Sequence, residues 1–251
     1  MKPIVVLRNE SEAPAGFLGD ALDRRGVDWS TVRLDAGDLL PSPAEVGGVA
    51  VLGGAMGVHD EQRFPFLVRE TRFVADCVHA GIPVLGLCLG CQMLAEVLGG
   101  RAYRAESAEV VFEAIEPTKE GLSEPVVAAM VGSRVIRFHQ DTFDLPRGTT
   151  LLATGGGFLQ AFRMGAAIGI QPHPEVTPAL LSGWLADGGG RRFAIESGAD
   201  PDGVIATFTA ARAEVETTAA AVFDAWIDEI SVPTSPAGAA NPGFVTPYAA
   251  P

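Results

Sequence analysis

The sequence predicts an α/β fold with a mostly parallel central sheet flanked by helices. Short apolar runs alternate with stretches of helical periodicity along the first half of the chain. These runs carry valine, isoleucine and leucine without polar alternation, which is typical of parallel strands buried on both faces. Hydrophobic residues make up 47% of the 251 positions, which is enough for a large core. In such sheets, functional sites lie at the carboxyl ends of the strands.

The first half contains four predicted strands and three predicted helices. Gly26 and Gly81 mark the ends of the first two helices. The second helix is amphipathic, and Cys77 lies on its apolar face with the other core residues. In chain order, we expect a strand over 3–7, a helix over 15–25, strands over 29–34 and 48–52, a helix over 64–80, a strand over 82–87 and a helix over 92–98.

The second half is richer in short strands and ends in helices. Gly188 to Gly190 predict a break, after which a short helix covers 191–196. Asp200 as N-cap and Pro201 at the first helical position then open a longer helix that continues to Ile230. Before the break, we expect strands over 110–115, 134–138, 150–153, 159–163 and 166–170 and a helix over 176–186.

These elements divide the chain into three parts. Residues 1–190 are predicted to form the main domain, 191–230 a helical extension packed on it, and 231–251 a tail rich in proline and alanine. The apolar side of the long helix has two interpretations. It packs on its own domain, which we favour, or it forms a homodimer contact between two copies of the chain.

The run Gly86-Leu87-Cys88-Leu89-Gly90 has the spacing of a nucleophile elbow. An apolar strand precedes Cys88 and a helix follows it, so the cysteine is expected on a sharp strand-to-helix turn above the sheet. The start of the helix favours the thiolate, which is the reactive form of cysteine. Cys88 is therefore the predicted nucleophile. Cys91, one helical turn further on, is expected in the core, with a redox pair with Cys88 as the alternative.

A nucleophilic cysteine requires a base, and His173 is the best placed of the four histidines. It follows a second apolar strand, within Gln171-Pro172-His173-Pro174-Glu175. The prolines stiffen this segment, and Glu175 can turn back to hold the imidazole. The sequence therefore predicts a triad of Cys88, His173 and Glu175.

These motifs resemble those of class I glutamine amidotransferases, in particular the stand-alone branch similar to the amidotransferase domain of GMP synthase. The combination of a cysteine elbow with a His-Pro-Glu tripeptide at this separation is a specific signal. The resemblance extends over residues 3–185 and implies a flavodoxin-like fold. It rests on Gly86–Gln92 and His173–Glu175, with support from Leu52-Gly53-Gly54-Ala55-Met56, Asp141–Pro146 and Gln160–Arg163.

The resemblance also implies roles for residues outside the triad. The backbone N–H groups of Gly54 and Leu89 would form the oxyanion hole, with Gly53 as the alternative to Gly54. Substrate α-amino and α-carboxylate groups would be bound near Gln92 and the segment His139-Gln140-Asp141. The sequence departs from the family pattern at two positions, with Gln140 in place of glycine and Pro172 in place of an aromatic residue. These departures leave open which group the substrate carries on its γ-carbonyl.

The expected reaction is hydrolysis of the γ-carboxamide of glutamine through a γ-glutamyl thioester. The sequence contains no phosphate-binding G-x-x-x-x-G-K-[ST] motif, so a separate synthetase would use the ammonia. The alternative is a self-sufficient hydrolase of γ-glutamyl amides or peptides. A regulatory module on the same fold without catalysis is the third hypothesis.

Net charge and cysteine content limit the kinds of partner, compartment and bound group that the sequence allows. The net charge of −13 argues against nucleic acid or an anionic membrane as partner. Three cysteines do not indicate a disulfide framework, and they fit a reducing cytoplasm. No apolar stretch has the length of a signal peptide or a membrane span. The histidines and cysteines lack metal-ligand spacing, so we expect neither a metal nor a cofactor.

Overall fold

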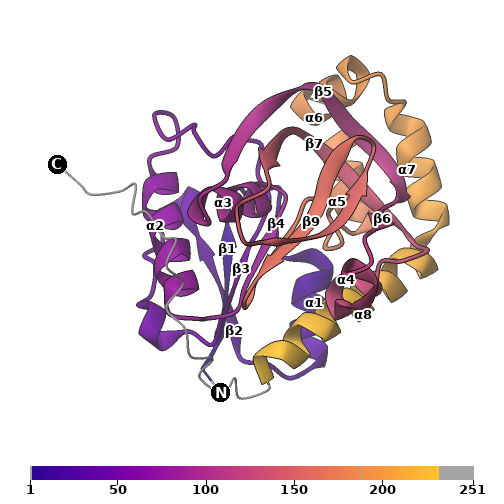
Figure 1. The fold of residues 1–251 in the computed structure, drawn as a ribbon. Helices are drawn as coiled ribbons and strands as arrows, with labels where there is room; N and C mark the ends of the chain where they lie inside the picture. Colours follow the sequence, from indigo (N-terminus) through magenta and orange to yellow (C-terminus); the bar gives the residue numbers. More distant parts are fainter. Residues whose placement is uncertain (1, 187, 232–251) are drawn as a thin grey trace.

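The computed structural model describes residues 2–186 and 188–231, and an eight-stranded mixed sheet forms its centre (Figure 1). The strands of this sheet are β1 (Ile4–Arg8), β2 (Trp29–Arg33), β3 (Gly48–Val51), β4 (Val84–Leu87), β6 (Glu116–Pro117), β8 (Thr150–Gly155), β9 (Phe158–Met164) and β10 (Ala167–Ile170). Their order in the described residues is β2-β1-β3-β4-β10-β9-β8-β6. The first five run parallel, and the last three continue the sheet in antiparallel pairs.

Helices cover both faces of this sheet (Figure 1). Residues of β1 alternate between the two sides: Ile4 and Val6 join one core, and Val5 and Leu7 join the other. The first core contains α1, α4 and α8, and the second contains α2 and α3. The helices are α1 (Gly16–Arg24), α2 (Phe66–His79), α3 (Leu89–Val97), α4 (Pro125–Ala128), α5 (Pro178–Ala186), α6 (Gly188–Glu196), α7 (Pro201–Ala210) and α8 (Arg212–Ser231), with short 3₁₀ turns at Leu34–Ala36, Pro43–Glu45 and Gly121–Ser123.

A separate two-stranded ribbon consists of β5 (Arg101–Ala114) and β7 (Arg134–Asp144), paired antiparallel. The register shifts between Arg104 and Glu109, so the ribbon is irregular at that point. Its apolar residues form a third core with helices α5 to α7, in which the ring of Phe112 meets that of Phe208 edge-on at 4.9 Å. Both strands are longer than the predicted 110–115 and 134–138, because residues 101–104 also pair with residues 141–144, where Ala102 and Phe143 join the second core.

The predicted fold class is confirmed, and the strands expected near residues 3–7, 29–34, 48–52 and 82–87 lie side by side in the sheet. The prediction of one long helix to Ile230 was wrong. Ala211 has a φ of −90° and a ψ of +16°, which are not helical, and its N–H is shared between the carbonyls of Thr207 and Phe208, so α7 ends before α8 begins. The break has a packing reason, since α7 covers the ribbon whereas most of α8 covers the main sheet.

The predicted break between two helices is present, since α5 ends at Ala186 and Gly188 has a φ of +70°, but α6 begins at Gly188 rather than at 191, so the glycines form its first turn. A side chain at Gly190 would meet the carbonyl oxygen of Trp184, so glycine there allows α6 to approach α5 closely. Buried Phe208, Val222 and Trp226 place the apolar side of α7 and α8 within the chain's own cores. The domain boundary at 190 stays a prediction, and residues 232–251 of the predicted tail lie outside the described residues.

A search of the described helices finds none that combines the length and the low polarity needed to cross a membrane.

Candidate active site

Cys88 lies on the turn between β4 and α3, as the elbow motif predicts. It has a φ of +50° and is alone among the described non-glycine residues in having a positive φ. The flanking glycines make this turn sterically feasible. A side chain at Gly86 would meet the carbonyl of Gly90, and one at Gly90 would meet the carbonyl of Val51 on the neighbouring strand. The backbone strain at Cys88 is therefore held in place by close packing of the elbow against β3.

The elbow glycine gives a first testable prediction. Gly90→Ala should destabilise the protein by about 1–3 kcal/mol, because its methyl group has no space beside the Val51 carbonyl. Gly183→Ala on α5 is the matched control, since no atom lies within 4 Å of the added methyl group. That variant should be stabilised by about 0.5–1 kcal/mol through helix propensity. Urea unfolding of both variants tests the prediction, and equal stability of the two would contradict the steric account.

Gln171 contacts the Cys88 thiol through its side-chain amide. Its Nε2 lies 3.5 Å from the Cys88 Sγ, while the Sγ lies 4.0 Å from the carbonyl oxygen of Phe138. A donor beside the sulfur stabilises a thiolate, which accepts hydrogen bonds. The sequence motif contains Gln171, but this role was not predicted from the sequence. Its position directly after β10, two residues before His173, was the signal that could have identified it.

The other two cysteines lie in different environments. Cys77 and Cys91 are both completely buried in the core between the sheet and α2 and α3. Burial raises the pKa of Cys77 to about 12 and raises the pKa of Cys91 well above its ordinary value. All three cysteines are free thiols. Cys88, at 6% exposed, is the cysteine that lines a cavity.

His173 lies directly beyond β10, the strand that pairs in parallel with β4. Its backbone N–H donates to the carbonyl of Ile136, 2.9 Å away, which anchors the segment to the ribbon. Its Nδ1 lies 2.7 Å from Glu175 Oε1, so the carboxylate holds the imidazole as the sequence predicts. The Nε2 is buried and makes no hydrogen bond within the described residues. Because β4 and β10 are neighbours, their carboxyl ends place Cys88 and His173 together.

The electrostatics of His173 reflect its two anionic neighbours. Burial disfavours the charged ring, but the negative charges of the Cys88 thiolate and of Glu175 outweigh this effect. Together they raise the pKa of His173 well above its ordinary value. An imidazolium beside a thiolate is the arrangement from which a cysteine attacks a carbonyl and a histidine then protonates the leaving group.

The two glycines that follow β3 lie against the elbow. A side chain at Gly53 would come within 3.0 Å of His173 Cε1 and 3.5 Å of Cys88 Cβ. A side chain at Gly54 would come within 3.2 Å of Leu89 Cδ2. We call this segment the Gly53–Gly54 loop. The backbone of this loop lies as close to Cys88 and His173 as glycine permits. This closeness fits backbone N–H groups that donate to an oxyanion, and the oxyanion hole itself stays a prediction.

The four predicted substrate-binding residues meet around the backbone of Asp141. Gln92 Nε2 donates to the Asp141 carbonyl at 2.9 Å and lies 3.3 Å from Gln171 Oε1. His139 Nδ1 lies 3.1 Å from the same carbonyl, and Gln140 Nε2 donates to Ala105. Gln92 thereby connects this segment to the amide that contacts Cys88. None of the four lines the cavity beside Cys88, so their contact with substrate stays a prediction.

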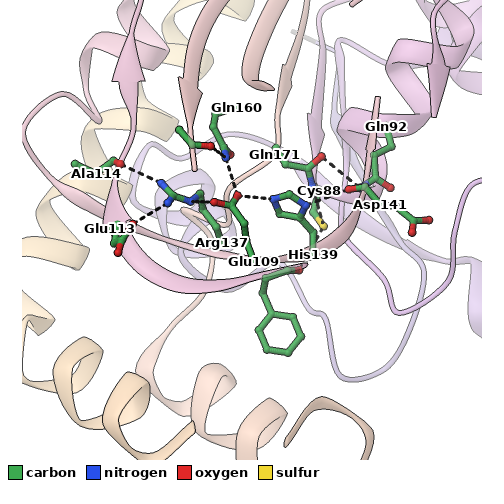
Figure 2. A network of polar contacts seen from close by, with 12 residues as sticks. Cys88, Gln92, Glu109, Glu113, Ala114, Arg137, His139, Asp141, Gln160 and Gln171 are labelled. Atoms are coloured by element: carbon green, nitrogen blue, oxygen red, sulfur yellow. Dashed lines mark hydrogen bonds and ion pairs between the residues drawn. The ribbon is translucent and has the colours of Figure 1, made fainter. Parts of the chain in front are cut away.

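A buried ionic network supports this segment (Figure 2). His139 Nε2 lies 3.0 Å from Glu109 Oε2, which also accepts from Gln160 at 2.8 Å. Arg137, only 1% exposed, pairs with Glu109 at 3.2 Å and Glu113 at 3.0 Å. Burial opposes the ionised form of Glu109, but His139 and Arg137 outweigh this and lower the pKa of Glu109. Both ring nitrogens of His139 thus have partners inside the protein, and Figure 2 shows the chain of contacts from Arg137 to Cys88.

A cavity of about 380 Å³ opens beside Cys88 and His173. Two carboxylates, Glu10 and Glu12, lie on its wall, and no lysine or arginine among the described residues does so. Burial, with the nearby charges of Glu12 and Asp35, raises the pKa of Glu10. This acidic wall is not evident from the sequence, because only the tertiary structure brings the loop after β1 to the cysteine. The cavity is lined by Glu10, Glu12, Ala13, Gly53, Gly54, Ala55, Cys88, Phe138, His173, Gly183, Trp184, Gly189 and Gly190.

Across residues 2–186 and 188–231, no three histidine, cysteine, aspartate or glutamate side chains are grouped as ligands for a metal ion.

Comparison with known proteins gives the family. The sequence matches the family described as glutamine amidotransferase class-I over residues 17–185, which is more than half of the chain. The chain therefore belongs to the class I glutamine amidotransferase family. It is also similar to a solved glutamine amidotransferase from Thermotoga maritima, with a TM-score of 0.78 and 26% identity over 90% of this chain and 98% of that one. The flavodoxin-like fold of the family is confirmed.

Curated relatives have several activities. The chain is 29% identical to the glutamine amidotransferase-like protein YfeJ of Salmonella typhimurium, over 77% of this chain and 86% of that protein. It is 33% identical to GMP synthase of Wolinella succinogenes over 53% of this chain, but the match spans only 25% of that enzyme. It is 28% identical to the gamma-glutamyl-L-1-hydroxyisopropylamide hydrolase of a Pseudomonas species, over 60% of this chain and 52% of the hydrolase.

Proposed function

We propose that this protein hydrolyses the γ-carboxamide of glutamine through a γ-glutamyl thioester on Cys88. The observation that carries the proposal is the position of Cys88 on a strained elbow, in a cavity shared with a histidine that Glu175 holds. The unpartnered Nε2 of His173 is the atom available for proton transfer. Cys88, His173 and Glu175 act as nucleophile, general acid and base, and orienting group.

The reaction proceeds in two balanced steps. Cys88 Sγ bonds to the γ-carbonyl carbon, and the resulting oxyanion is bound by the backbone N–H groups of Gly54 and Leu89. His173 donates its proton to the nitrogen as the carbon–nitrogen bond breaks, which releases ammonia. Water, deprotonated by His173, then attacks the thioester carbon and releases glutamate and the free thiol. Gln171 stabilises the thiolate before attack and after product release.

The ammonia is proposed to serve a separate acceptor or synthetase. The relatives named GMP synthase [glutamine-hydrolyzing] support this role, although the match spans only a quarter of the length of the Wolinella succinogenes enzyme. In this account, the α-amino and α-carboxylate groups of glutamine lie toward Gln92 and the segment His139-Gln140-Asp141.

A second candidate function is the hydrolysis of substituted γ-glutamyl amides without a partner. The cavity beside Cys88 and His173 favours it, because this cavity also reaches Glu10, Glu12 and Trp184 and so has room for a group on the amide nitrogen. Ammonia needs no such space, whereas an amine substituent does. The similarity to the Pseudomonas hydrolase, which by its name acts on a γ-glutamyl amide, also supports this candidate.

Substrate preference distinguishes the two functions. Purified protein should be assayed with glutamine and with γ-glutamyl amides of neutral, cationic and anionic amines. A glutaminase subunit is expected to be nearly inactive alone and to prefer glutamine. Robust unaided turnover of a γ-glutamyl amide, with glutamine a poor substrate, would overturn the first candidate in favour of the second. In that case the acidic wall predicts the lowest kcat/KM for amides of anionic amines, because two carboxylates repel the leaving group.

A further inference from the structure

Two buried glutamines connect the ribbon to the Cys88 sulfur. Gln92 lies in the first turn of α3 and is 3% exposed, and Gln171 lies directly after β10 and is 0% exposed. Gln92 Nε2 donates to the Asp141 carbonyl at 2.9 Å and to Gln171 Oε1 at 3.3 Å. Gln171 Nε2 in turn lies 3.5 Å from Cys88 Sγ. We call the Asp141 carbonyl, Gln92 and Gln171 the amide relay (Figure 2).

A backbone carbonyl fixes the direction of the hydrogen bonds in the amide relay. The oxygen of Asp141 can only accept, so Gln92 must present its nitrogen there. The second hydrogen of Gln92 Nε2 then meets Gln171, which must present its oxygen. A side-chain amide has its oxygen on one side and its nitrogen on the other. Gln171 is therefore left with an N–H group toward Cys88, and the sulfur faces a donor.

The orientation of Gln171 matters because its two amide positions have opposite effects on the sulfur. With the nitrogen toward Sγ, the amide donates to a thiolate, whereas an oxygen in the same place would repel the negative charge. The carbonyl of Phe138, 4.0 Å from Sγ, accepts from a thiol but offers no hydrogen bond to a thiolate. We propose that Gln92 is a positioning residue, which orients Gln171 so that Gln171 stabilises the Cys88 thiolate.

The far end of the amide relay is held in place by the buried ionic network. His139 Nδ1 lies 3.1 Å from the Asp141 carbonyl, and His139 Nε2 lies 3.0 Å from Glu109 Oε2. Arg137 pairs with the same glutamate at 3.2 Å. A carbonyl oxygen has two lone pairs, so it can accept from both Gln92 and His139. The carbonyl that sets the direction of the relay is thereby fixed within the ribbon.

This inference gives Gln92 a role that needs no contact with substrate. Both hydrogens of its Nε2 have acceptors inside the protein, and Gln92 does not line the cavity beside Cys88. A substrate group that bound this nitrogen would have to displace one of the two hydrogen bonds. The expected effect on hydrolysis rests on the proposed function, whereas the expected effect on the thiolate does not.

The test measures the thiolate directly, through the rate at which iodoacetamide alkylates Cys88 between about pH 4 and pH 10. Gln171→Leu should raise the pH of half-maximal rate by about 1 unit, because a hydrogen bond to a charged group is lost. Gln92→Leu should raise it by a smaller amount, since the Gln171 amide remains but is free to rotate. In the double variant, the shift should equal that of Gln171→Leu alone, because Gln92 acts only through Gln171.

Further variants control for background and for folding. Cys88→Ser measures alkylation at other sites, and Gln62→Leu, which removes an exposed amide outside the relay, should leave the profile unchanged. Thermal melting checks that each variant folds. Gln171→Glu has the shape of glutamine but places an acceptor beside the sulfur. It should therefore raise the pH of half-maximal rate further than Gln171→Leu, and it keeps the test decisive if a leucine variant fails to fold.

The titratable side chains near the sulfur are the same in the wild-type, Gln92 and Gln171 proteins, so differences between their profiles report the amide relay. These side chains include His173, Cys91, Glu10 and Glu12.

The outcomes decide between positioning and substrate binding. A Gln92→Leu profile that superimposes on the wild-type profile would overturn the proposal. Shifts of the two single variants that add in the double variant would also overturn it, since Gln92 would then act on Cys88 by another route. With glutamine as substrate, Gln92→Leu should lower kcat below the pH of half-maximal alkylation and change KM by less than about two-fold.

A raised KM with an unchanged alkylation profile would make Gln92 a substrate-binding residue and would overturn the positioning role. If no γ-glutamyl substrate is hydrolysed by the wild-type protein, the proposed function fails. The alkylation profiles still decide the positioning role in that case, because alkylation of Cys88 needs no turnover.

Discussion

Serine in place of Cys88 is expected to abolish hydrolysis, with kcat/KM lower by on the order of 10⁴-fold or more. The hydroxyl group stays protonated beside His173 and is a far weaker nucleophile than a thiolate. The fold should persist, because serine is nearly isosteric and occupies the same elbow between Gly86 and Gly90. Steady-state assays with the best substrate of the panel measure the loss, and thermal melting checks the fold.

A covalent probe assigns the nucleophile independently of turnover. A diazo-ketone analogue of glutamine should add once to the wild-type protein, and peptide mapping should place the adduct on Cys88. Cys91→Ser is the matched control, since Cys91 is buried and the pKa of its thiol is raised by burial. That variant should keep the adduct. An adduct on Cys77 or Cys91 in the wild type would refute the assignment of Cys88.

Removal of His173 should have the second largest effect. His173→Ala is expected to lower kcat by about 10³- to 10⁴-fold, because both the imidazolium beside the thiolate and the proton donor to the leaving group are lost. His79→Ala, which changes an exposed histidine at the end of α2, serves as control and should retain full activity. Near-normal turnover of His173→Ala would rule out the triad.

Glu175 is expected to matter less than His173. Glu175→Gln keeps an oxygen that can accept from His173 Nδ1, now 2.7 Å from the carboxylate, but removes the negative charge. Glu175→Ala removes both. Activity should therefore decrease in the order wild type, Glu175→Gln, Glu175→Ala, His173→Ala. A Glu175→Ala variant less active than His173→Ala would indicate that the carboxylate has a role other than orienting this imidazole.

Local sequence signals were sufficient for the elbow and the histidine loop. The elbow needs small residues at fixed spacing because its turn is short, so Gly86, Cys88 and Gly90 identify it without tertiary information. His173 and Glu175 are two residues apart, so their contact is also local. The order of apolar runs predicted a parallel sheet, and the parallel arrangement of β4 and β10 brings Cys88 and His173 to one edge.

Helix boundaries in the C-terminal region depended on packing. The periodicity of apolar residues runs through Ala211 without interruption, but α7 and α8 cover different layers, and the chain must change direction between them. At Gly188 to Gly190, intrinsic preference disfavours a helix, yet the close approach of α6 to the end of α5 requires glycine. Both helix boundaries differ from the expected ones because tertiary contacts override local propensity.

The sequence by itself determined the α/β class, the nucleophile elbow and the pairing of His173 with Glu175, because each depends on residues close together in the chain. Only the tertiary structure decided what surrounds them. It placed Gln171 on the Cys88 sulfur and Glu10 on the wall of the cavity. These contacts join residues that are distant in sequence, and their energetics depend on burial and on the absence or presence of a partner. No local pattern encodes those quantities, since they arise only when the strands and helices pack together.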